Sequence, residues 1–574
     1  MIFGWVIPLL ILGLIIFGFR RLLVSARQRT GTDVSIRQVF QYIILFGLVL
    51  ISGTGVSGLL GRVLDTGRVV AESRTDLARN LTFAIVGLPL VYLFIRWTTR
   101  NFAADPQERN GIAWQGYLTL TSITTLSLSL TGIHDLLSWV IGNDPYRGSA
   151  VAGSLVWTVV WWLHWRASQS LRASSVHSQS RGVPHLLLGS AVGLGLVAVG
   201  VGGLIGNIVE SLFNTSGDAV FVESTNPLVN SAINIVVGAP VWYLYWLKNG
   251  QKLSRELLWY LYVFLAGITA SFITVVASVS IVIYDVLVWY FGDVGSKSAS
   301  EHFLSISHPL GSAAIGVAVW WYHRTLLGTH KRNEVRRIYE YIVSGVSMIA
   351  ASLGLLMIFV AAVESFTPSD VVTTSNGANT LIVAITLLLV GAPIWWFFWG
   401  RIQRHTLIDS DEIASPTRRI FILMLFGVAG VAAVISTITS VFFLFDDLLN
   451  TQLAWETLRK ARFALGILVT NGAISGYHWS IYRHEKEVAV KRAHTGKFVV
   501  LVGPSDGEVA QELQRKIGGR VQLWSADGAA GSHLVDGEAW NLDEVADLIE
   551  QTTSDEVMIL NEKRKLRAIP IHRP

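Results

Sequence analysis

The sequence contains no cysteine and is poor in charged residues. Without a thiol anywhere in the 574 residues, disulfides, thiolate metal sites, iron–sulfur clusters and cysteine nucleophiles are excluded. Asp, Glu, Lys and Arg make up 15% of the chain, hydrophobic residues make up 51%, and the mean hydropathy is +0.49. Soluble domains carry about 25% charged residues. The composition therefore indicates an integral membrane protein.

Catalytic and cofactor-binding patterns are also missing. The segment "GLGLVAVG" lies inside an apolar run, and no strand precedes it, so it is not a dinucleotide fingerprint. The segment "VGPSDG" lacks the lysine of a Walker motif and is interpreted as an ordinary turn between a strand and a helix. We therefore expect no enzymatic activity, no bound cofactor, no metal and no nucleic-acid partner.

Long apolar segments between charged breaks predict thirteen membrane-spanning helices. They lie near residues 2–19, 39–60, 81–97, 113–139, 150–165, 185–209, 229–247, 257–291, 309–322, 338–363, 379–399, 420–444 and 463–481. In the first segment Arg20 and Arg21 follow the apolar run, which is typical of a retained helix with its N-terminus outside and not of a cleaved signal peptide.

The basic residues predict the orientation of the spans. Alternate connecting segments, beginning with 20–38, hold 27 Lys and Arg residues, whereas the other set, beginning with 61–79, holds nine. Cytoplasmic loops retain positive charge in membrane proteins. We therefore expect a multi-pass protein of the plasma membrane with its N-terminus outside and its C-terminus in the cytoplasm.

The chain repeats itself three times. A Gly-x-Pro element recurs at Pro89, Pro240 and Pro393 with separations of 151 and 153 residues, and a histidine near a helix end recurs at His164, His323 and His478. The simplest parse is an N-terminal helix with a basic linker followed by three four-helix units, over residues 1–36, 37–173, 182–330 and 334–490. Because each unit has an even number of helices, the units are parallel repeats and not inverted ones. The predicted fold class is an all-α polytopic membrane protein with a small C-terminal α/β domain.

The repeated elements resemble those of a known domain. The matching motifs are GAPxWxxxxW and W-[LY]-H, at Pro240, Pro393, His164 and His323. They resemble an uncharacterised prokaryotic four-helix membrane domain of unknown function that is often found in tandem, over about residues 37–490. The first copy has Leu88 and Val91 in place of Ala and Trp, and the third lacks the Trp pair before His478. The resemblance implies a fold and supplies no activity.

The last residues form a separate pattern. From Lys497 the sequence reads as strand, helix, strand, helix and hairpin, with Ser505 or Asp506 as the first N-cap and a second cap near Asn541. Residues 497–574 are therefore predicted to form a small cytoplasmic α/β domain that binds a protein partner or regulates the membrane part.

Thirteen of the 21 tryptophans lie in the closing helices of the predicted hairpins. An aromatic belt at one membrane interface explains them, and a cage for a quaternary ammonium ligand is the alternative. The repeated histidines beside arginines are interpreted as interfacial residues, with haem ligation as the alternative, because His185 is the one other span histidine near that face. The three prolines are candidate helix kinks that shape the bundle, or a broken-helix binding site.

Acidic residues recur at the predicted outer ends of outward-running helices. They are Asp65, Asp135, Glu210, Asp285, Glu364, Asp446 and Asp447. A carboxylate at a helix C-terminus opposes the helix dipole, so each is expected to cap the N-terminus of the next helix. The alternative is an outer vestibule that attracts cations.

The best-supported hypothesis from the sequence is a non-enzymatic scaffold or sensor, embedded in the lipid bilayer, whose C-terminal domain contacts a protein partner. The alternative is a transporter or channel for a small solute or cation, with a path near the proline kinks. The predicted span centres are nearly free of charge, whereas carriers usually hold an ionisable residue in mid-span. This observation favours the scaffold or sensor.

Overall fold

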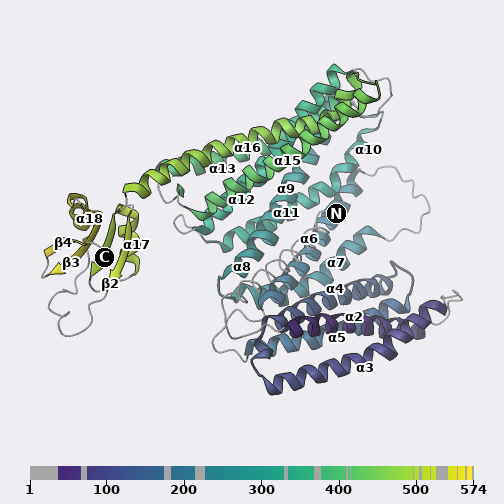
Figure 1. Ribbon diagram of the computed structural model, residues 1–574. Coiled ribbons are helices and arrows are strands. Elements are labelled where there is room, and N and C mark those ends of the chain that lie inside the picture. Colours follow the sequence, from purple (N-terminus) through teal and green to yellow (C-terminus); the bar gives the residue numbers. More distant parts are fainter. Residues whose placement is uncertain are drawn as a thin grey trace. The chain divides into compact units, whose positions relative to one another are not determined.

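A computed structural model describes most of the chain beyond the first 35 residues (Figure 1). The described residues are 36–65, 74–173, 183–213, 226–295, 297–328, 334–367, 377–408, 412–413, 415–495, 497–502, 507–517, 519–524, 541–552, 554–562 and 565–571. The predicted first span near residues 2–19 lies outside them.

The chain divides into two compact units. Unit 1 comprises Met1–Lys331, Gly345–Gly354 and Thr373–Ile394, and unit 2 comprises Arg332–Ser344, Leu355–Val372 and Trp395–Pro574. The first two predicted repeats fall within unit 1.

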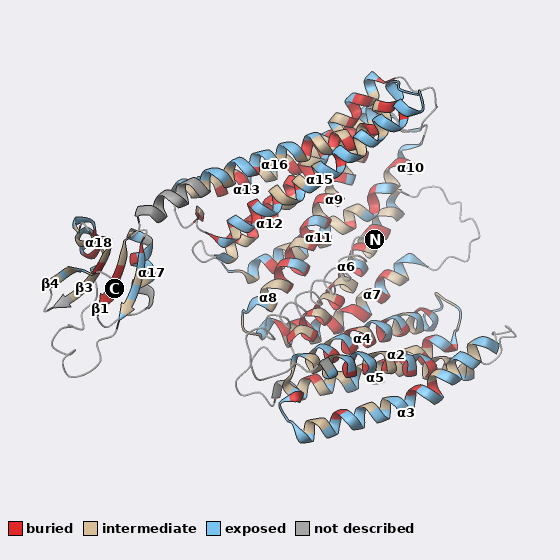
Figure 2. Cartoon of the chain, in the orientation of Figure 1, coloured by how far each residue is buried: buried red, intermediate tan, exposed pale blue. Residues whose placement is uncertain are grey.

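The first predicted repeat forms four long helices and one short turn. They are α2 (Ile36–Leu64), α3 (Arg74–Ala104), the 3₁₀ turn η1 (Glu108–Asn110), α4 (Ile112–Val140) and α5 (Gly148–Ala173). Its core joins Tyr42 and Leu45 of α2 to Tyr117 and Leu118 of α4. α3 is the least covered of these helices, because only 17% of its most apolar window is buried (Figure 2).

The second predicted repeat contains two π-helical segments. Its elements are α6 (Val183–Phe213), α7 (Pro227–Trp242), the π-helix η2 (Tyr243–Leu247), η3 (Gly250–Lys252), α8 (Leu257–Tyr262), the π-helix η4 (Val263–Thr269), α9 (Ala270–Phe291), α10 (Ala299–Phe303), η5 (Leu304–Ile306) and α11 (Ser307–Leu326). π-Bulges are rare and occur frequently at functional sites.

The third predicted repeat forms four long helices. They are α12 (Glu334–Phe366), α13 (Gly377–Ile408), α15 (Pro416–Leu449) and α16 (Trp455–Thr495). With 41 residues, α16 is about 60 Å long at 1.5 Å per residue, twice the thickness of a bilayer core.

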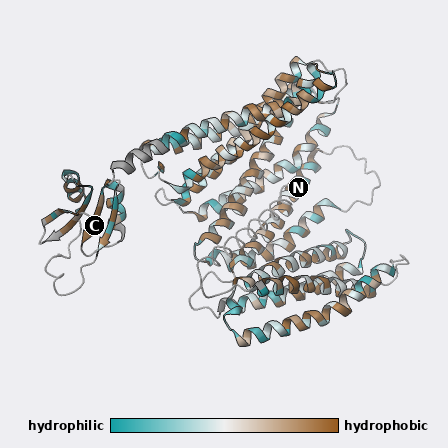
Figure 3. Ribbon diagram, in the orientation of Figure 1, coloured by the Kyte–Doolittle hydropathy of each residue, from teal (hydrophilic) through white to brown (hydrophobic). Residues whose placement is uncertain are grey.

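Nine helices in the described part of the chain are long and apolar enough to cross a membrane, and Figure 3 shows hydrophobic positions following one another along them. This supports a multi-pass membrane protein and is fewer than the thirteen spans predicted. The predicted spans 113–139, 150–165 and 463–481 fall on helices α4, α5 and α16, which are outside the nine. In α4 the reason is its many hydroxyl side chains, of which Thr125 and Ser127 donate to carbonyls of their own helix.

The first two predicted repeats share one hydrophobic core within unit 1. Leu126 and Leu130 of α4 belong to the same buried cluster as Ile233 and Val237 of α7. Ring contacts extend this junction, since the distance between the ring centroids of Trp165 and Tyr245 is 4.6 Å.

The C-terminal residues form a small mixed sheet with two helices. The elements are β1 (Phe498–Val502), α17 (Gly507–Ile517), β2 (Arg520–Trp524), α18 (Leu542–Gln551), β3 (Glu556–Glu562) and β4 (Lys565–Pro570). In the order β2-β1-β3-β4, β1 pairs in parallel with both neighbours and β4 closes an antiparallel hairpin.

This order of strands and helices is the one predicted, and the predicted cap is present, since the Asn541 side chain accepts the backbone N–H of Asp543. The first predicted cap, at Ser505 or Asp506, lies outside the described residues.

Candidate functional site

A buried polar cluster joins α12, α13, α15 and α16 near the ends of these helices. Arg418, in the first turn of α15, lies at its centre. The side chain of Arg418 is only 1% exposed. Its Nε and Nη2 atoms donate to Glu485 Oε1 of α16 at 2.8 and 2.6 Å. Nη1 donates to the hydroxyl of Tyr341 at 3.2 Å, and Nη2 also reaches Gln403 at 3.1 Å. One guanidinium group therefore holds side chains from three other helices.

A second charge pair adjoins the first through Tyr341. The fully buried carboxylate of Glu412 accepts Arg337 Nε at 2.9 Å and the Tyr341 hydroxyl at 3.4 Å. Arg337 also donates to Glu334 at 2.6 Å. We call Arg337, Tyr341, Gln403, Glu412, Arg418 and Glu485 the α16 clamp. Removing a charged group from water costs several kcal/mol per ion, and this cost is offset here because the charges are paired and their donors and acceptors are hydrogen-bonded.

The first repeat carries half of the same arrangement. Its buried Glu108 accepts Arg37 Nη2 at 3.1 Å and the Tyr42 hydroxyl at 3.2 Å. Six residues after Glu108 stands Trp114, stacked on Tyr117, whereas six residues after Glu412 stands Arg418. The arginine that holds the fourth helix is therefore a feature of the third repeat and not of the first.

α16 connects this clamp to the C-terminal sheet. The helix continues ten residues beyond Glu485 to Thr495, and β1 begins at Phe498 (Figure 1). Lys497, between the two, is already part of the sheet domain: its carbonyl accepts the N–H of Arg520 at 3.1 Å, and its ammonium donates to the carbonyl of Ile549 at 2.6 Å. One residue, Gly496, therefore separates the end of α16 from the sheet domain in the sequence.

The repeated histidines are enclosed by protein. His323 and His478 are 0% and 1% exposed, and His164 is half-buried. In all three, Nδ1 lies 2.8 Å from the carbonyl oxygen four residues earlier, so Nδ1 carries a proton. Nε2 of His164 is 3.0 Å from the Tyr117 hydroxyl. These rings therefore contact aromatic side chains of their own repeats, and their position at a membrane interface stays a prediction.

Repeats two and three share one aromatic arrangement around their histidines. Six residues after the proline, Trp246 and Trp399 donate from Nε1 to the hydroxyls of Tyr322 and Tyr477, each at 2.9 Å. These tyrosines directly precede the histidines. In the first repeat Leu163 stands at the tyrosine position, so this hydrogen bond has no equivalent there.

The three prolines lie inside long helical segments. Pro89 and Pro393 are within α3 and α13, and Pro240 lies three residues before the π-helix η2. Gly87 allows its helix to approach α2 closely, since a Cβ there would collide with the Ser52 side chain. Whether these positions act as kinks or as a binding site stays a prediction.

The predicted outer acids each contact a group of their own repeat. Asp65 accepts the N–H of Gly148, the first residue of α5, at 2.9 Å. Asp285 accepts the Ser305 hydroxyl at 2.8 Å. The remaining contacts are Glu210 with His308 at 3.5 Å, Asp135 with His134 at 3.6 Å, Glu364 with Arg462 at 3.0 Å, Asp446 with Asn450 at 3.3 Å, and Asp447 with Thr457 at 2.6 Å and Lys460 at 2.8 Å. The hydrogen bond to Asp447 raises the pKa of the Lys460 ammonium.

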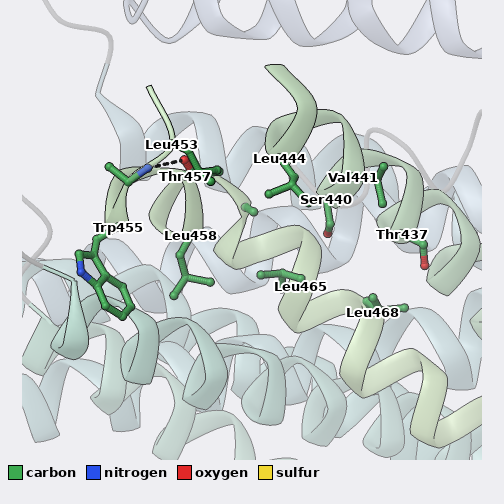
Figure 4. Close-up of a pocket in the computed structure, with 12 residues that line it drawn as sticks. Thr437, Ser440, Val441, Leu444, Leu453, Trp455, Thr457, Leu458, Leu465 and Leu468 are labelled. Atoms are coloured by element: carbon green, nitrogen blue, oxygen red, sulfur yellow. Dashed lines mark hydrogen bonds between the residues drawn. The ribbon is translucent and has the colours of Figure 1, made fainter. Parts of the chain in front are cut away.

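An apolar cavity opens between α15 and α16 near the loop that joins them. Its volume is about 660 Å³, and Figure 4 shows Leu444 and Val441 of α15 facing Leu458 and Leu465 of α16 across it. The polar groups in the wall are used locally; the Thr457 hydroxyl, for instance, donates to Asp447 and accepts the N–H of Ala454.

Among the described residues no three His, Asp or Glu side chains come together in a way that could hold a metal ion. The α16 clamp was not found from the sequence. Its only sequence signal is the pair of repeated glutamates, Glu108 and Glu412, each in a segment between predicted spans.

Comparison with known proteins finds one family. The model described as "Domain of unknown function (DUF5671)" matches residues 38–163, 184–322 and 337–473. The three matches follow one another along the chain and leave the C-terminal sheet domain uncovered. No curated protein and no solved structure matches the chain.

Proposed function

Since the chain belongs to the DUF5671 family and carries three copies of its domain in tandem, we propose that it is a non-enzymatic membrane sensor. In this proposal the third copy passes its conformational state through α16 to residues 497–574. The C-terminal domain is the output module, and it binds a protein partner in the cytoplasm.

The observation that carries this proposal is the buried, hydrogen-bonded ion pair between Arg418 and Glu485. This pair holds α16 at a point ten residues before the end of the helix. Two more residues lie between that end and β1, the first strand of the output module. In this proposal a displacement of α16 at Glu485 is carried along the helix to Thr495, from which Gly496 and Lys497 lead to the start of β1. A scaffold that only anchors its tail would need no buried charge pair at this position.

The placement of the output module in the cytoplasm rests on charge. Two of the 27 basic residues on the predicted inner side, Arg337 and Arg418, belong to the clamp, and Arg401, Arg404 and Arg419 lie in the same predicted inner segment as Arg418. Positive segments stay on the cytoplasmic side of the plasma membrane.

The distribution of buried charge supports a sensor more than a transporter. In the described third repeat the buried carboxylates and guanidinium groups lie near the helix ends: Arg337, Glu340, Glu412 and Arg418 at one end and Asp447 at the other. The buried imidazole ring of His478 is the exception, since it lies inside the predicted span 463–481. Carriers usually hold such groups at the middle of the membrane, where they bind the substrate or the coupling ion. Transport of a small solute or cation would therefore need a path that avoids charged side chains.

Amide hydrogen exchange of the full chain in nanodiscs tests the proposal. Glu485→Gln removes the charge but keeps an acceptor, so it loosens the clamp. We expect faster exchange in the last two turns of α16 and a changed exchange rate in β1 and β3 of the output module. His484→Gln is the matched control, because His484 is the neighbouring residue and is exposed.

If Glu485→Gln accelerates exchange in α16 but leaves β1 and β3 identical to the wild type, α16 is an anchor and the sensor proposal fails. Uptake measured with the same protein in proteoliposomes provides the second readout. A cation or solute flux that Glu485→Gln leaves unchanged would favour the transporter.

A further inference from the structure

The junction between the first two repeats uses one face of α4 and one face of α7. Leu126 and Leu130 on α4 are 2% and 7% exposed, and Ile233 and Val237 on α7 are 1% and 6% exposed. All four belong to one packed cluster. The second helix of one repeat thus packs against the third helix of the repeat before it. We call the face of the third helix the receiving face and the face of the second helix the inserting face.

A polar joint accompanies this packing and recurs further along the chain. Asn226, fourteen residues before Pro240, donates its N–H to Asn143 in the α4–α5 loop at 2.5 Å. Asn379, fourteen residues before Pro393, accepts the N–H of Asp293 in the α9–α10 loop at 2.9 Å. The same repeat position therefore closes both junctions.

The third repeat presents the receiving face without a fourth repeat to cover it. Leu126 and Leu130 lie nine and five residues before Asp135; the residues at the same spacing before Asp446 are Thr437 and Val441. Both line the cavity between α15 and α16 (Figure 4). Val441 is 42% exposed, whereas Leu130, at the equivalent position of the first repeat, is 7% exposed.

In the first repeat the residues at the positions of the inserting face are exposed. Ile233, Val237 and Val241 lie at −7, −3 and +1 relative to Pro240, and the residues at these positions relative to Pro89 are Thr82, Val86 and Leu90. Val86 and Leu90 are 53% and 36% exposed, whereas Val237 and Val241 are 6% and 9% exposed. One chain therefore carries both halves of its own repeat junction, the inserting face in the first repeat and the receiving face in the third.

We propose that the cavity face of α15 and α16 in one chain receives α3 of a second copy, as α4 receives α7 within the chain. The contact is heterologous, since two different surfaces meet, and it therefore builds rings or open rows of chains instead of a closed twofold dimer. In lipid, close packing of complementary helix faces drives such association. The proposal does not depend on the sensor function.

Disulfide cross-linking in the cysteine-free chain tests the proposal. Thr82→Cys places a thiol on the inserting face, and Val441→Cys places one on the receiving face. Each variant is purified, shown to melt as the wild type does, and reconstituted alone or mixed with the other. Oxidation of the mixture should give a covalent dimer, and oxidation of either variant alone should give monomers. The double variant in one chain should give a ladder of dimers and larger species.

The control variants are Leu81→Cys and Phe442→Cys. Each is one residue from its partner, so its thiol lies at the same depth but about 100° around the helix. Their mixture should stay monomeric. A dimer formed by Val441→Cys alone would show an isologous contact and overturn the proposal. Monomers in every mixture would show that lipid, or residues outside the described part of the chain, cover these faces, and would also overturn it.

A second measurement does not depend on cysteine. The mass of the wild-type chain in nanodiscs should correspond to two or more copies. Val441→Trp fills the cavity and should reduce the mass to that of one copy, whereas Phe442→Trp should not. A wild-type chain that is monomeric at every concentration would contradict the proposal.

Discussion

At the residue scale, Arg418 determines how the third repeat is held together. A buried guanidinium group is unfavourable unless its donors are used, and Arg418 uses its donors on Glu485, Tyr341 and Gln403. It thereby fixes α16 against the other helices that contribute to the clamp.

Removing one partner of this pair should therefore be costly. Glu485→Leu leaves Arg418 as an uncompensated buried charge and should lower the free energy of unfolding by about 3–5 kcal/mol. The double variant Arg418→Met/Glu485→Leu should lose less than Glu485→Leu alone, because no charge then remains buried. Denaturant unfolding in detergent measures both. Arg419→Met is the control, since Arg419 is exposed and should change stability by less than about 0.5 kcal/mol. A double variant that loses as much stability as Glu485→Leu, or more, would contradict the pairing.

The acids at the opposite helix ends differ in what they contact. Asp65 accepts the N–H of the first residue of α5, so Asp65→Asn should weaken a cap worth about 0.5–2 kcal/mol. Asp135 is 49% exposed and close to His134, so Asp135→Asn should leave the melting temperature nearly unchanged. If the acids form a cation vestibule, both variants should instead depress cation flux in proteoliposomes, most strongly at low ionic strength. Equal melting of the two variants together with such a loss of flux would support the vestibule.

At the element scale, periodic features were predictable and side-chain networks were not. The helices of the three repeats follow from apolar runs, and the strands of the C-terminal domain follow from short β-branched runs such as "KFVVLV". The π-helices beside Pro240 and in the segment 263–269 carry no distinct pattern, because an extra residue per turn leaves composition unchanged. Arg418 and Glu485 are 67 residues apart, and nothing local indicates that they meet.

The C-terminal domain is an element that should fold without the membrane part. Its core joins Val499 and Leu501 of β1 to Val557 and Ile559 of β3 and to the helices, and all four of these residues are fully buried. Residues 497–574 expressed alone should therefore melt cooperatively and show dispersed amide resonances. A disordered amide spectrum would show that this domain folds only when attached to α16.

At the scale of the whole molecule, the distribution of basic residues predicts which connecting segments lie outside the cell. Single cysteines at Ser216 and Ser375 should react with an impermeant thiol reagent from outside the cell, and a cysteine at Ser410 should react only after permeabilisation. Ser216 and Ser375 are in connecting segments predicted to lie outside the cell, and Ser410 is in one predicted to lie inside. All three positions are outside the described residues. Labelling of Ser410→Cys in intact cells would show that the topology is the reverse of the predicted one, with the C-terminal domain outside.

In the proposed function α16 carries the state of the third repeat to the C-terminal domain. The most direct test breaks this helix between the clamp and the sheet by replacing Ala489 and Val490 with glycine, which favours bending in a helix interior. In the chain with an intact α16, Glu485→Gln should change amide exchange in β1 and β3. In the glycine background the same substitution should leave the exchange of these strands unchanged, while still loosening α16 around residue 485. An equal change in β1 and β3 in both backgrounds would show that the signal does not travel through α16.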